Sequence, residues 1–171
     1  MQKIIKNKKG FSLVELVLYI SVLIILLGSI FLFMGLVFES KAKSQTINEV
    51  ERQGEFIIRT ILQTVRNTNT INSPTVGSSS NSLSINVKNP TNSPTTFALN
   101  GTGLVMTEAS QTPVILNNNL VEIKNIVFRN VSQPSTTGII RVEITIAHVN
   151  PENQNEFKYE KTFYGSATVR K

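Results

Sequence analysis

Residues 8–38 read KKGFSLVELVLYISVLIILLGSIFLFMGLVF and decide the architecture of this chain of 171 residues. Within this stretch, residues 16–38 are 23 consecutive residues without a charge. At about 1.5 Å rise per residue, such a helix exceeds the roughly 30 Å thickness of the hydrocarbon core of a bilayer. A cleavable secretory signal would have a shorter apolar region, of about 7 to 15 residues. The sequence therefore predicts one helix that spans a membrane and is retained.

The basic residues gather before this apolar run. The chain has 17 Lys and Arg against 11 Asp and Glu, a formal charge of +6, yet residues 11–171 carry only 13 basic against 11 acidic residues. Four lysines of the first ten residues make the difference: Lys3, Lys6, Lys8 and Lys9. Because basic residues flank membrane helices on the cytoplasmic side, we expect the amino terminus inside and residues 39–171 outside. Total charge is therefore a poor argument for nucleic-acid binding.

Glu15 conflicts with a plain membrane anchor. It is the fifth residue of the apolar run that begins at Phe11. A charged group at membrane depth costs on the order of 2.5 to 3.5 kcal/mol, so it needs a partner there. One interpretation puts the carboxylate at the headgroup boundary, where it reaches water. The other gives it a cationic partner, and the neighbouring residues favour this second interpretation.

Residues 8–16, KKGFSLVEL, resemble the leader of type IV prepilins. The shared features are a short basic peptide, a glycine, a phenylalanine that starts the mature chain and a glutamate at its fifth position. The matching positions are Lys9, Gly10, Phe11, Ser12, Leu13, Glu15 and Leu16. The resemblance extends over residues 1–38 and implies that a prepilin peptidase cuts between Gly10 and Phe11 on the cytoplasmic side. It also implies N-methylation of the new amine of Phe11.

The same resemblance implies how such subunits assemble. The Glu15 carboxylate would pair with the cationic amine of Phe11 on a neighbouring subunit, because opposite charges offset each other's desolvation in a low dielectric. A head-to-tail contact of this kind propagates into an open helical filament. The implied partners are the prepilin peptidase, other pilin or pseudopilin subunits, an inner-membrane assembly platform and, before assembly, membrane lipid.

Residues 39–66 are predicted to continue the membrane helix as an amphipathic helix. Their apolar or small residues recur at spacings of three and four: Ile47, Val50, Gly54, Ile57, Ile58, Ile61, Leu62 and Val65. The charged residues between them are expected to form a solvated face with helical ion pairs. One helix would then run from Phe11 to Arg66, over 56 residues. Three glycines are possible flexible points in it: Gly28, Gly35 and Gly54.

Composition changes at Asn67. Residues 67–96 contain twenty Ser, Thr or Asn, which favours loops around one short strand at 83–87. Further strands are predicted at 96–99, 103–107, 114–116 and 120–131. The clearest alternation occurs in 139–149 and 156–164, which predict an antiparallel hairpin, and a final strand is expected at 167–170.

Together these patterns predict an α+β fold of the pilin-like kind, a long helix packed on an antiparallel β-sheet. Four segments are expected: a cleaved leader (1–10), a transmembrane and assembly helix (11–38), an amphipathic continuation (39–66) and a β-rich head (67–171). The head loosely resembles the J-type minor pseudopilin of type II secretion or the W-type minor pilin. Without cysteine, the chain lacks the disulfide that closes the carboxyl-terminal loop of many major pilins.

No catalytic or metal site is indicated by the sequence. The chain has neither cysteine nor aspartate, and its single histidine, His148, has no companions for a ligand set. Asn100 and Asn130 begin the sequons NGT and NVS, which turn chemistry explains equally well in a chain rich in asparagine and serine. We therefore expect neither enzymatic activity nor a cofactor or metal.

The sequence predicts a minor pilin or pseudopilin, a structural subunit of a type IV pilus or type II secretion-like filament. Such a subunit is first a single-pass protein of the cytoplasmic membrane and then part of an extracellular or periplasmic filament. A filament-borne adhesin or DNA-uptake subunit is one alternative. It requires basic residues on one patch, and the candidates are scattered in the sequence: Lys88, Lys124, Arg129 and Arg141. An unprocessed single-pass membrane protein with an external β domain is the other alternative.

Overall fold

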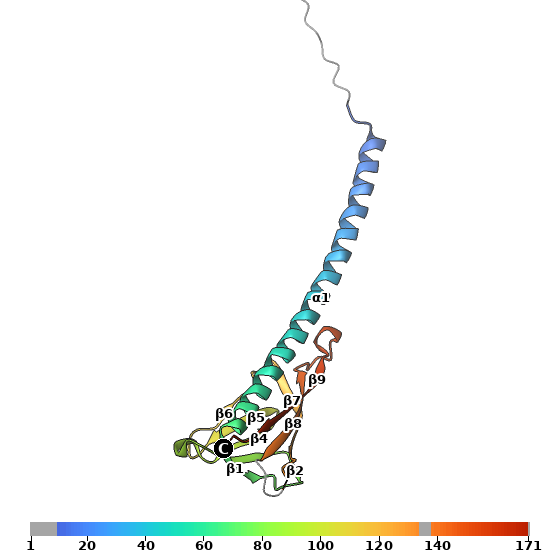
Figure 1. Cartoon of the computed structure of the whole chain (residues 1–171). Helices are drawn as coiled ribbons and strands as arrows, with labels where there is room; N and C mark the ends of the chain where they lie inside the picture. Colours follow the sequence, from blue (N-terminus) through green and yellow to red (C-terminus); the bar gives the residue numbers. More distant parts are fainter. Residues whose placement is uncertain (1–9, 134–137, 171) are drawn as a thin grey trace, which may run out of the picture. The chain divides into compact units, whose positions relative to one another are not determined.

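The computed structural model describes residues 10–133 and 138–170. The chain divides into two compact units, Met1–Lys41 and Ala42–Lys171. One long helix, α1 (Leu13–Arg66), contributes to both units, and the strands of the described residues belong to the second (Figure 1). The expectation of one continuous helix is confirmed, although it begins at Leu13 rather than at Phe11.

Local hydrogen bonds mark both ends of α1. Ser12 precedes the helix, and its carbonyl accepts the first backbone hydrogen bond of the helix, from the Leu16 N–H at 3.1 Å. At the other end, Thr68 Oγ1 donates to the Thr64 carbonyl at 3.0 Å. Because the last C=O groups of a helix lack partners within it, the Thr68 bond satisfies one of them where the helix ends.

The second part of α1 is amphipathic, as the spacing predicted. Its buried residues form one stripe: Thr46, Val50, Gly54, Ile57, Ile58, Ile61 and Val65. Gly54 has a packing role in this stripe, because a Cβ placed there would fall within 2.7 Å of Phe163 Cδ2. The glycine therefore lets β9 approach the helix closely. The sequence suggested a flexible point at Gly54, and the structure adds this close contact with β9.

Two antiparallel sheets, rather than the single expected sheet, form the rest of the second unit. Their strand orders are β1-β3-β4-β5-β6 and β2-β7-β8-β9. The first sheet contains β1 (Thr68–Ser73), β3 (Leu83–Val87), β4 (Thr95–Asn100), β5 (Gly103–Glu108) and β6 (Val114–Ile115). The second contains β2 (Ser79–Ser80), β7 (Val121–Asn130), β8 (Ile139–His148) and β9 (Glu160–Thr168). Two short 3-10 helices, η1 (Pro90–Asn92) and η2 (Asn155–Phe157), lie in the connections.

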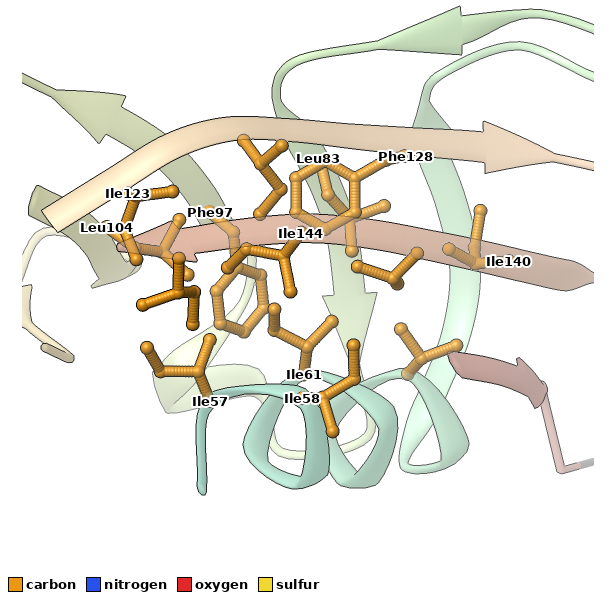
Figure 2. Packing of buried hydrophobic residues seen from close by; sticks show 14 of the residues in the cluster. Ile57, Ile58, Ile61, Leu83, Phe97, Leu104, Ile123, Phe128, Ile140 and Ile144 are labelled. Carbon is orange, nitrogen blue, oxygen red and sulfur yellow. The ribbon is translucent and has the colours of Figure 1, made fainter. Parts of the chain in front are cut away.

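Both sheets and the helix share one hydrophobic core. Figure 2 shows Ile57, Ile58 and Ile61 of α1 pointing toward side chains of the strands. The strand residues labelled there are Leu83, Phe97, Leu104, Ile123, Phe128, Ile140 and Ile144, all of them buried. Burying one such side chain contributes about 1.5–3 kcal/mol, so this shared cluster holds the helix and sheets together. The fold class is α+β, with one long helix and antiparallel sheets.

The prediction of loops around a single strand in residues 67–96 was wrong, because β1 and β2 also lie there. β1 carries one large apolar residue, Ile71, so hydrophobic periodicity does not mark it. Polar side chains join it to β3 instead. Asn72 Nδ2 donates to Asn86 Oδ1 at 2.9 Å, and Asn86 Nδ2 donates to Thr70 Oγ1 at 3.0 Å. Cross-strand hydrogen bonds of this kind stabilise a sheet much as apolar pairs do.

The hairpin of β8 and β9 is confirmed, but the bounds expected for its second strand were wrong. β9 is one continuous strand, Glu160–Thr168, where two strands at 156–164 and 167–170 were expected. Phe157 belongs to η2 instead. Gly165, which separated the two expected strands, lies against α1, because a Cβ there would come within 2.8 Å of Leu62 and 3.0 Å of Ile58. This glycine permits a close approach without ending the strand.

Candidate processing and assembly site

The bond between Gly10 and Phe11 lies just before α1, outside regular secondary structure. Both residues are exposed, and Phe11 leaves 74% of its surface uncovered. A Cβ built on Gly10 meets nothing within 4 Å. A protease that acts on this bond would therefore meet an accessible peptide with little side-chain bulk on its amino-terminal side. The four leader lysines, Lys3, Lys6, Lys8 and Lys9, lie outside the described residues.

Glu15 lies in the first turn of α1 and is only partly exposed. The first N–H groups of a helix have no partner within it and carry partial positive charge, which favours a carboxylate at this position. Two other polar side chains of the apolar run are satisfied within the helix: Ser21 Oγ donates to Leu18 O and Ser29 Oγ to Leu26 O, each at 2.8 Å. Glu15 therefore stands apart as the charged group of this run.

Tyr19 contacts Glu15 directly, and sequence reasoning missed it. The Tyr19 hydroxyl donates to Glu15 Oε1 at 3.1 Å. The Phe11 ring meets the Tyr19 ring edge-on, with 6.2 Å between centroids and 74° between planes. Glu15 and Tyr19 are spaced by four residues in α1, so they share one helix face, and this spacing could have revealed the tyrosine. In the described part of the chain, Tyr19 is the sole hydrogen-bond partner of this carboxylate.

The rest of the apolar run has no cover within its unit. Large apolar side chains at most positions of residues 13–38 are exposed. By length and composition, α1 contains one stretch able to cross a membrane, and the described residues hold one such helix. A single apolar helix followed by a β domain fits a single-pass membrane protein.

The charges on the outer face of α1 form the expected helical ion pairs. Arg52 pairs with Glu49 at 2.8 Å, and Arg59 pairs with Glu55 at 2.9 Å. Burial raises the pKa of Glu49, but hydrogen bonds from Arg52 and Asn118 outweigh that effect and lower the pKa overall. The Asn118 bond, 2.6 Å long, also ties this helix face to the segment before β7.

Glu51 joins α1 to β9 instead of pairing along the helix. Its Oε1 accepts hydrogen bonds from Lys161 Nζ at 2.7 Å and from the Tyr159 hydroxyl at 3.3 Å. The bond from Lys161 holds the pKa of Glu51 below its ordinary value, and the same bond raises the pKa of Lys161. Sequence reasoning missed this pair because its partners are far apart in the chain.

The basic residues expected to be scattered are partly brought together. Arg129 of β7 and Arg141 of β8 lie directly opposite each other. Lys124 instead pairs with Glu122 at 2.6 Å, and Lys88 follows β3 of the other sheet. The two arginines are far apart in the sequence, and only the strand register reveals that they are neighbours.

The remaining candidates have local structural partners. His148 stacks on Phe157, with 5.5 Å between ring centroids, and its Nδ1 lies 2.9 Å from the Val149 carbonyl. Asn130 is buried, donates to the Pro74 carbonyl at 2.8 Å and contacts the Ser132 hydroxyl. Its sequon therefore serves the turn after β7.

Asn100 closes the hairpin of β4 and β5. It pairs with Gly103, and Gly101 between them adopts φ of +61°. Glycine adopts such a backbone conformation at little cost, as two-residue hairpin loops require. The sequon that begins at Asn100 is thus part of a tight turn, as turn chemistry suggested. Among the described residues, no group of three or more His, Cys, Asp or Glu side chains could hold a metal ion.

Comparisons with known proteins give no match whose site could be compared with this one. Searches with the chain against protein-family models, curated proteins and solved structures find no match. A functional interpretation therefore depends on the amino-terminal residues and on the contacts described above.

Proposed function

We propose that this chain is a minor pilin or pseudopilin, a subunit of a type IV pilus or type II secretion-like filament. One observation carries the proposal. Glu15 is a carboxylate with a single hydrogen-bond partner in the described chain, and it lies four residues after an accessible Gly10–Phe11 bond at the start of an uncovered apolar helix. The resemblance of residues 8–16 to prepilin leaders assigns a role to each of these features.

In this proposal, a prepilin peptidase cuts the Gly10–Phe11 bond at the cytoplasmic face and methylates the amine of Phe11. The apolar helix stays in the membrane, with its amino terminus inside and the β domain outside. Tyr19 occupies one oxygen of Glu15, Oε1. The other oxygen remains available to the Phe11 amine of a neighbouring subunit, so that two charges that are costly in lipid offset each other.

In the filament, the two parts of α1 would have different roles. Residues 42–66 have an apolar face that the β domain of the same chain buries. Residues 13–38 keep their apolar side chains exposed, so these must contact lipid or the helices of other subunits. The expected partners are therefore the peptidase, other pilin or pseudopilin subunits, an assembly platform of the inner membrane and, before assembly, lipid. The role is structural, with no catalytic group assigned.

The first experiment expresses the full chain with and without an active prepilin peptidase and determines its intact mass and amino-terminal peptide. We expect a mature chain that starts at methylated Phe11. Gly10→Val should block cleavage, because a branched side chain would stand beside the bond that is cut. Gly28→Val is the matched control: it makes the same substitution at an open position of α1 and should still be processed.

The second arm tests assembly separately from processing. Glu15→Gln should be cleaved normally yet fail to enter filaments, whereas Glu39→Gln, at an exposed position later in α1, should assemble like the unmodified chain. A chain that retains Met1 to Gly10 beside an active peptidase would overturn the proposal. The protein would then be an unprocessed membrane-anchored β domain.

A further inference from the structure

The outer face of the four-stranded sheet carries an unusual row of polar residues. Strands β7 and β8 alternate between the core and this face: Phe128 and Val142 are buried, whereas Arg129 and Arg141 are exposed. In register, Ser79 of β2 pairs with Arg129, Arg129 pairs with Arg141, and Arg141 pairs with Ser166 of β9. One row thus crosses all four strands and has two arginines in its centre. We call Ser79, Arg129, Arg141 and Ser166 the arginine row.

Two like charges directly opposite each other weaken a strand pair, so this arrangement costs stability unless something neutralises it. Glu143 lies one row away, beside Val127 and Tyr164, and is the nearest candidate. In the described part of the chain, however, neither Arg129 nor Arg141 forms an ion pair, with Glu143 or with any other acid. The positive charge of the arginine row is therefore not neutralised by these residues.

The surface above the row is hollow. A shallow cavity of about 610 Å³ is lined by both arginines, Glu143, Ser166 and the exposed ring of Tyr164. Tyr164 leaves 68% of its surface uncovered, although it is a large aromatic residue in a strand. The Ser79 and Ser166 hydroxyls form no hydrogen bond within the described residues, so both ends of the row offer donors. The cavity thus combines two cations without ion pairs and the Ser166 hydroxyl beside the ring of Tyr164.

We propose that the arginine row binds a phosphate group. Each guanidinium presents a planar fork of N–H donors that matches the oxygens of phosphate, and two forks side by side can hold different oxygens of one tetrahedral anion. A single carboxylate would neutralise only one of the two charges. The doubly charged form of phosphate neutralises both, which removes the repulsion within the strand pair. This site lies on the β domain and is independent of leader processing.

The test is isothermal titration calorimetry of the full, unprocessed chain in an uncharged maltoside detergent and Tris buffer. The probes are inorganic phosphate and linear tripolyphosphate. We expect saturable binding to one site, and at least a tenfold loss of affinity in Arg129→Ala and in Arg141→Ala. Glu143→Gln should raise the affinity, because it removes the one negative charge that lines the cavity. A role limited to folding would not produce this gain.

Arg59→Ala is the matched control, since Arg59 is also exposed but already paired with Glu55. It should leave phosphate affinity unchanged. Tighter binding of tripolyphosphate than of phosphate, with the same dependence on both arginines, assigns the row to a phosphate chain; equal binding assigns it to a single group. Absence of saturable binding of both probes, or an equal loss in Arg59→Ala, would overturn the proposal. Arg129→Lys provides a second, milder variant if an alanine variant fails to fold.

Discussion

Gly54→Ala is expected to destabilise the second unit, although alanine is the better helix former. Gly54 is buried where α1 meets β9. A Cβ at this position would lie 2.7 Å from Cδ2 of Phe163 and closer still to Cε2 and Cζ of the same ring. Because carbon atoms in ordinary contact are about 3.5–4.0 Å apart, the ring would have to retreat by roughly 1 Å or more.

Two opposing effects set the magnitude. Replacing glycine by alanine within a helix stabilises it by up to ~1 kcal/mol. Overpacking a filled core typically costs ~1–3 kcal/mol. The net change for Gly54→Ala is therefore a loss of about 1 kcal/mol in the free energy of unfolding. Gly54→Val adds more bulk at the same point and should lose about 3 kcal/mol.

The assay is urea unfolding of the full chain in an uncharged maltoside detergent, followed by near-ultraviolet circular dichroism. Tyr159 and Tyr164 report on the second unit, and the linear dependence on urea gives the free energy of unfolding. Phe163→Ala is the matched control, prepared alone and together with Gly54→Ala. Without the ring, the added methyl group has room, so Gly54→Ala should then stabilise by up to ~1 kcal/mol.

A flexible point at Gly54 leads to the opposite expectation. If the glycine served only to loosen the helix, alanine would stabilise the chain whether or not residue 163 carries an aromatic ring. Equal stabilisation by Gly54→Ala in both backgrounds would therefore refute the packing role of Gly54. A change of sign between the backgrounds would establish direct coupling between the helix and β9.

Three further predictions concern the same unit. The Glu51–Lys161 ion pair lowers the pKa of Glu51 from 4.5 and raises that of Lys161 from 10.5. The stabilisation by this pair should therefore be complete between these two values. It should be lost as the pH falls through the pKa of Glu51 or rises through that of Lys161. Lys161→Gln should remove this part of the pH dependence of the urea midpoint. Arg129→Ala should raise the free energy of unfolding by roughly 0.2–1 kcal/mol at low salt, because repulsion from Arg141 disappears, and the gain should shrink in about 0.5 M NaCl. Asn130→Ala should cost about 1–3 kcal/mol by the same urea assay, since it leaves buried groups unpaired.

Matched variants separate these effects from simple changes of charge. Arg59→Ala removes an exposed arginine that is paired with Glu55, and it should lower stability by about 0.3–0.5 kcal/mol where Arg129→Ala raises it. Similar gains in both variants would indicate a general effect of net charge. Lys158→Gln removes a lysine that forms no ion pair among the described residues, so it should preserve the pH profile. An unchanged acid limb in Lys161→Gln, or a negligible effect of Asn130→Ala, would contradict the respective prediction.

Elements with strong periodicity could be predicted from the sequence. The apolar run and the stripe from Val50 to Val65 predicted α1 to within two residues, and the alternation of Ile140, Val142, Ile144 and Ile146 predicted β8. β1 could not be predicted in this way, because its pairing with β3 depends on asparagine and threonine side chains instead of apolar alternation. Where asparagine and threonine side chains join two strands in this way, the local composition predicts loops instead of strands.

Contacts between residues far apart in the sequence were harder to predict. The pairing of Glu51 with Lys161 spans 110 residues, and the opposition of Arg129 and Arg141 exists only once the strand register is fixed. Tyr19 was a different kind of omission, since its spacing of four from Glu15 was visible in the sequence. In an apolar run, a tyrosine counts as one more hydrophobic residue. Its polar role is evident only when a carboxylate one helical turn away is recognised as a partner for its hydroxyl.

The chemistry of α1 also determines what can drive assembly in the proposed filament. Moving the apolar side chains of residues 13–38 from lipid to neighbouring helices yields no hydrophobic gain, because lipid tails are as apolar as the side chains themselves. Packing alone would therefore select weakly between membrane and filament. Glu15 is different, because it has one hydrogen-bond partner within the described chain and a cost in lipid that a cationic amine removes. In the proposed filament, this one carboxylate contributes more to the choice of the assembled state than the whole apolar surface around it.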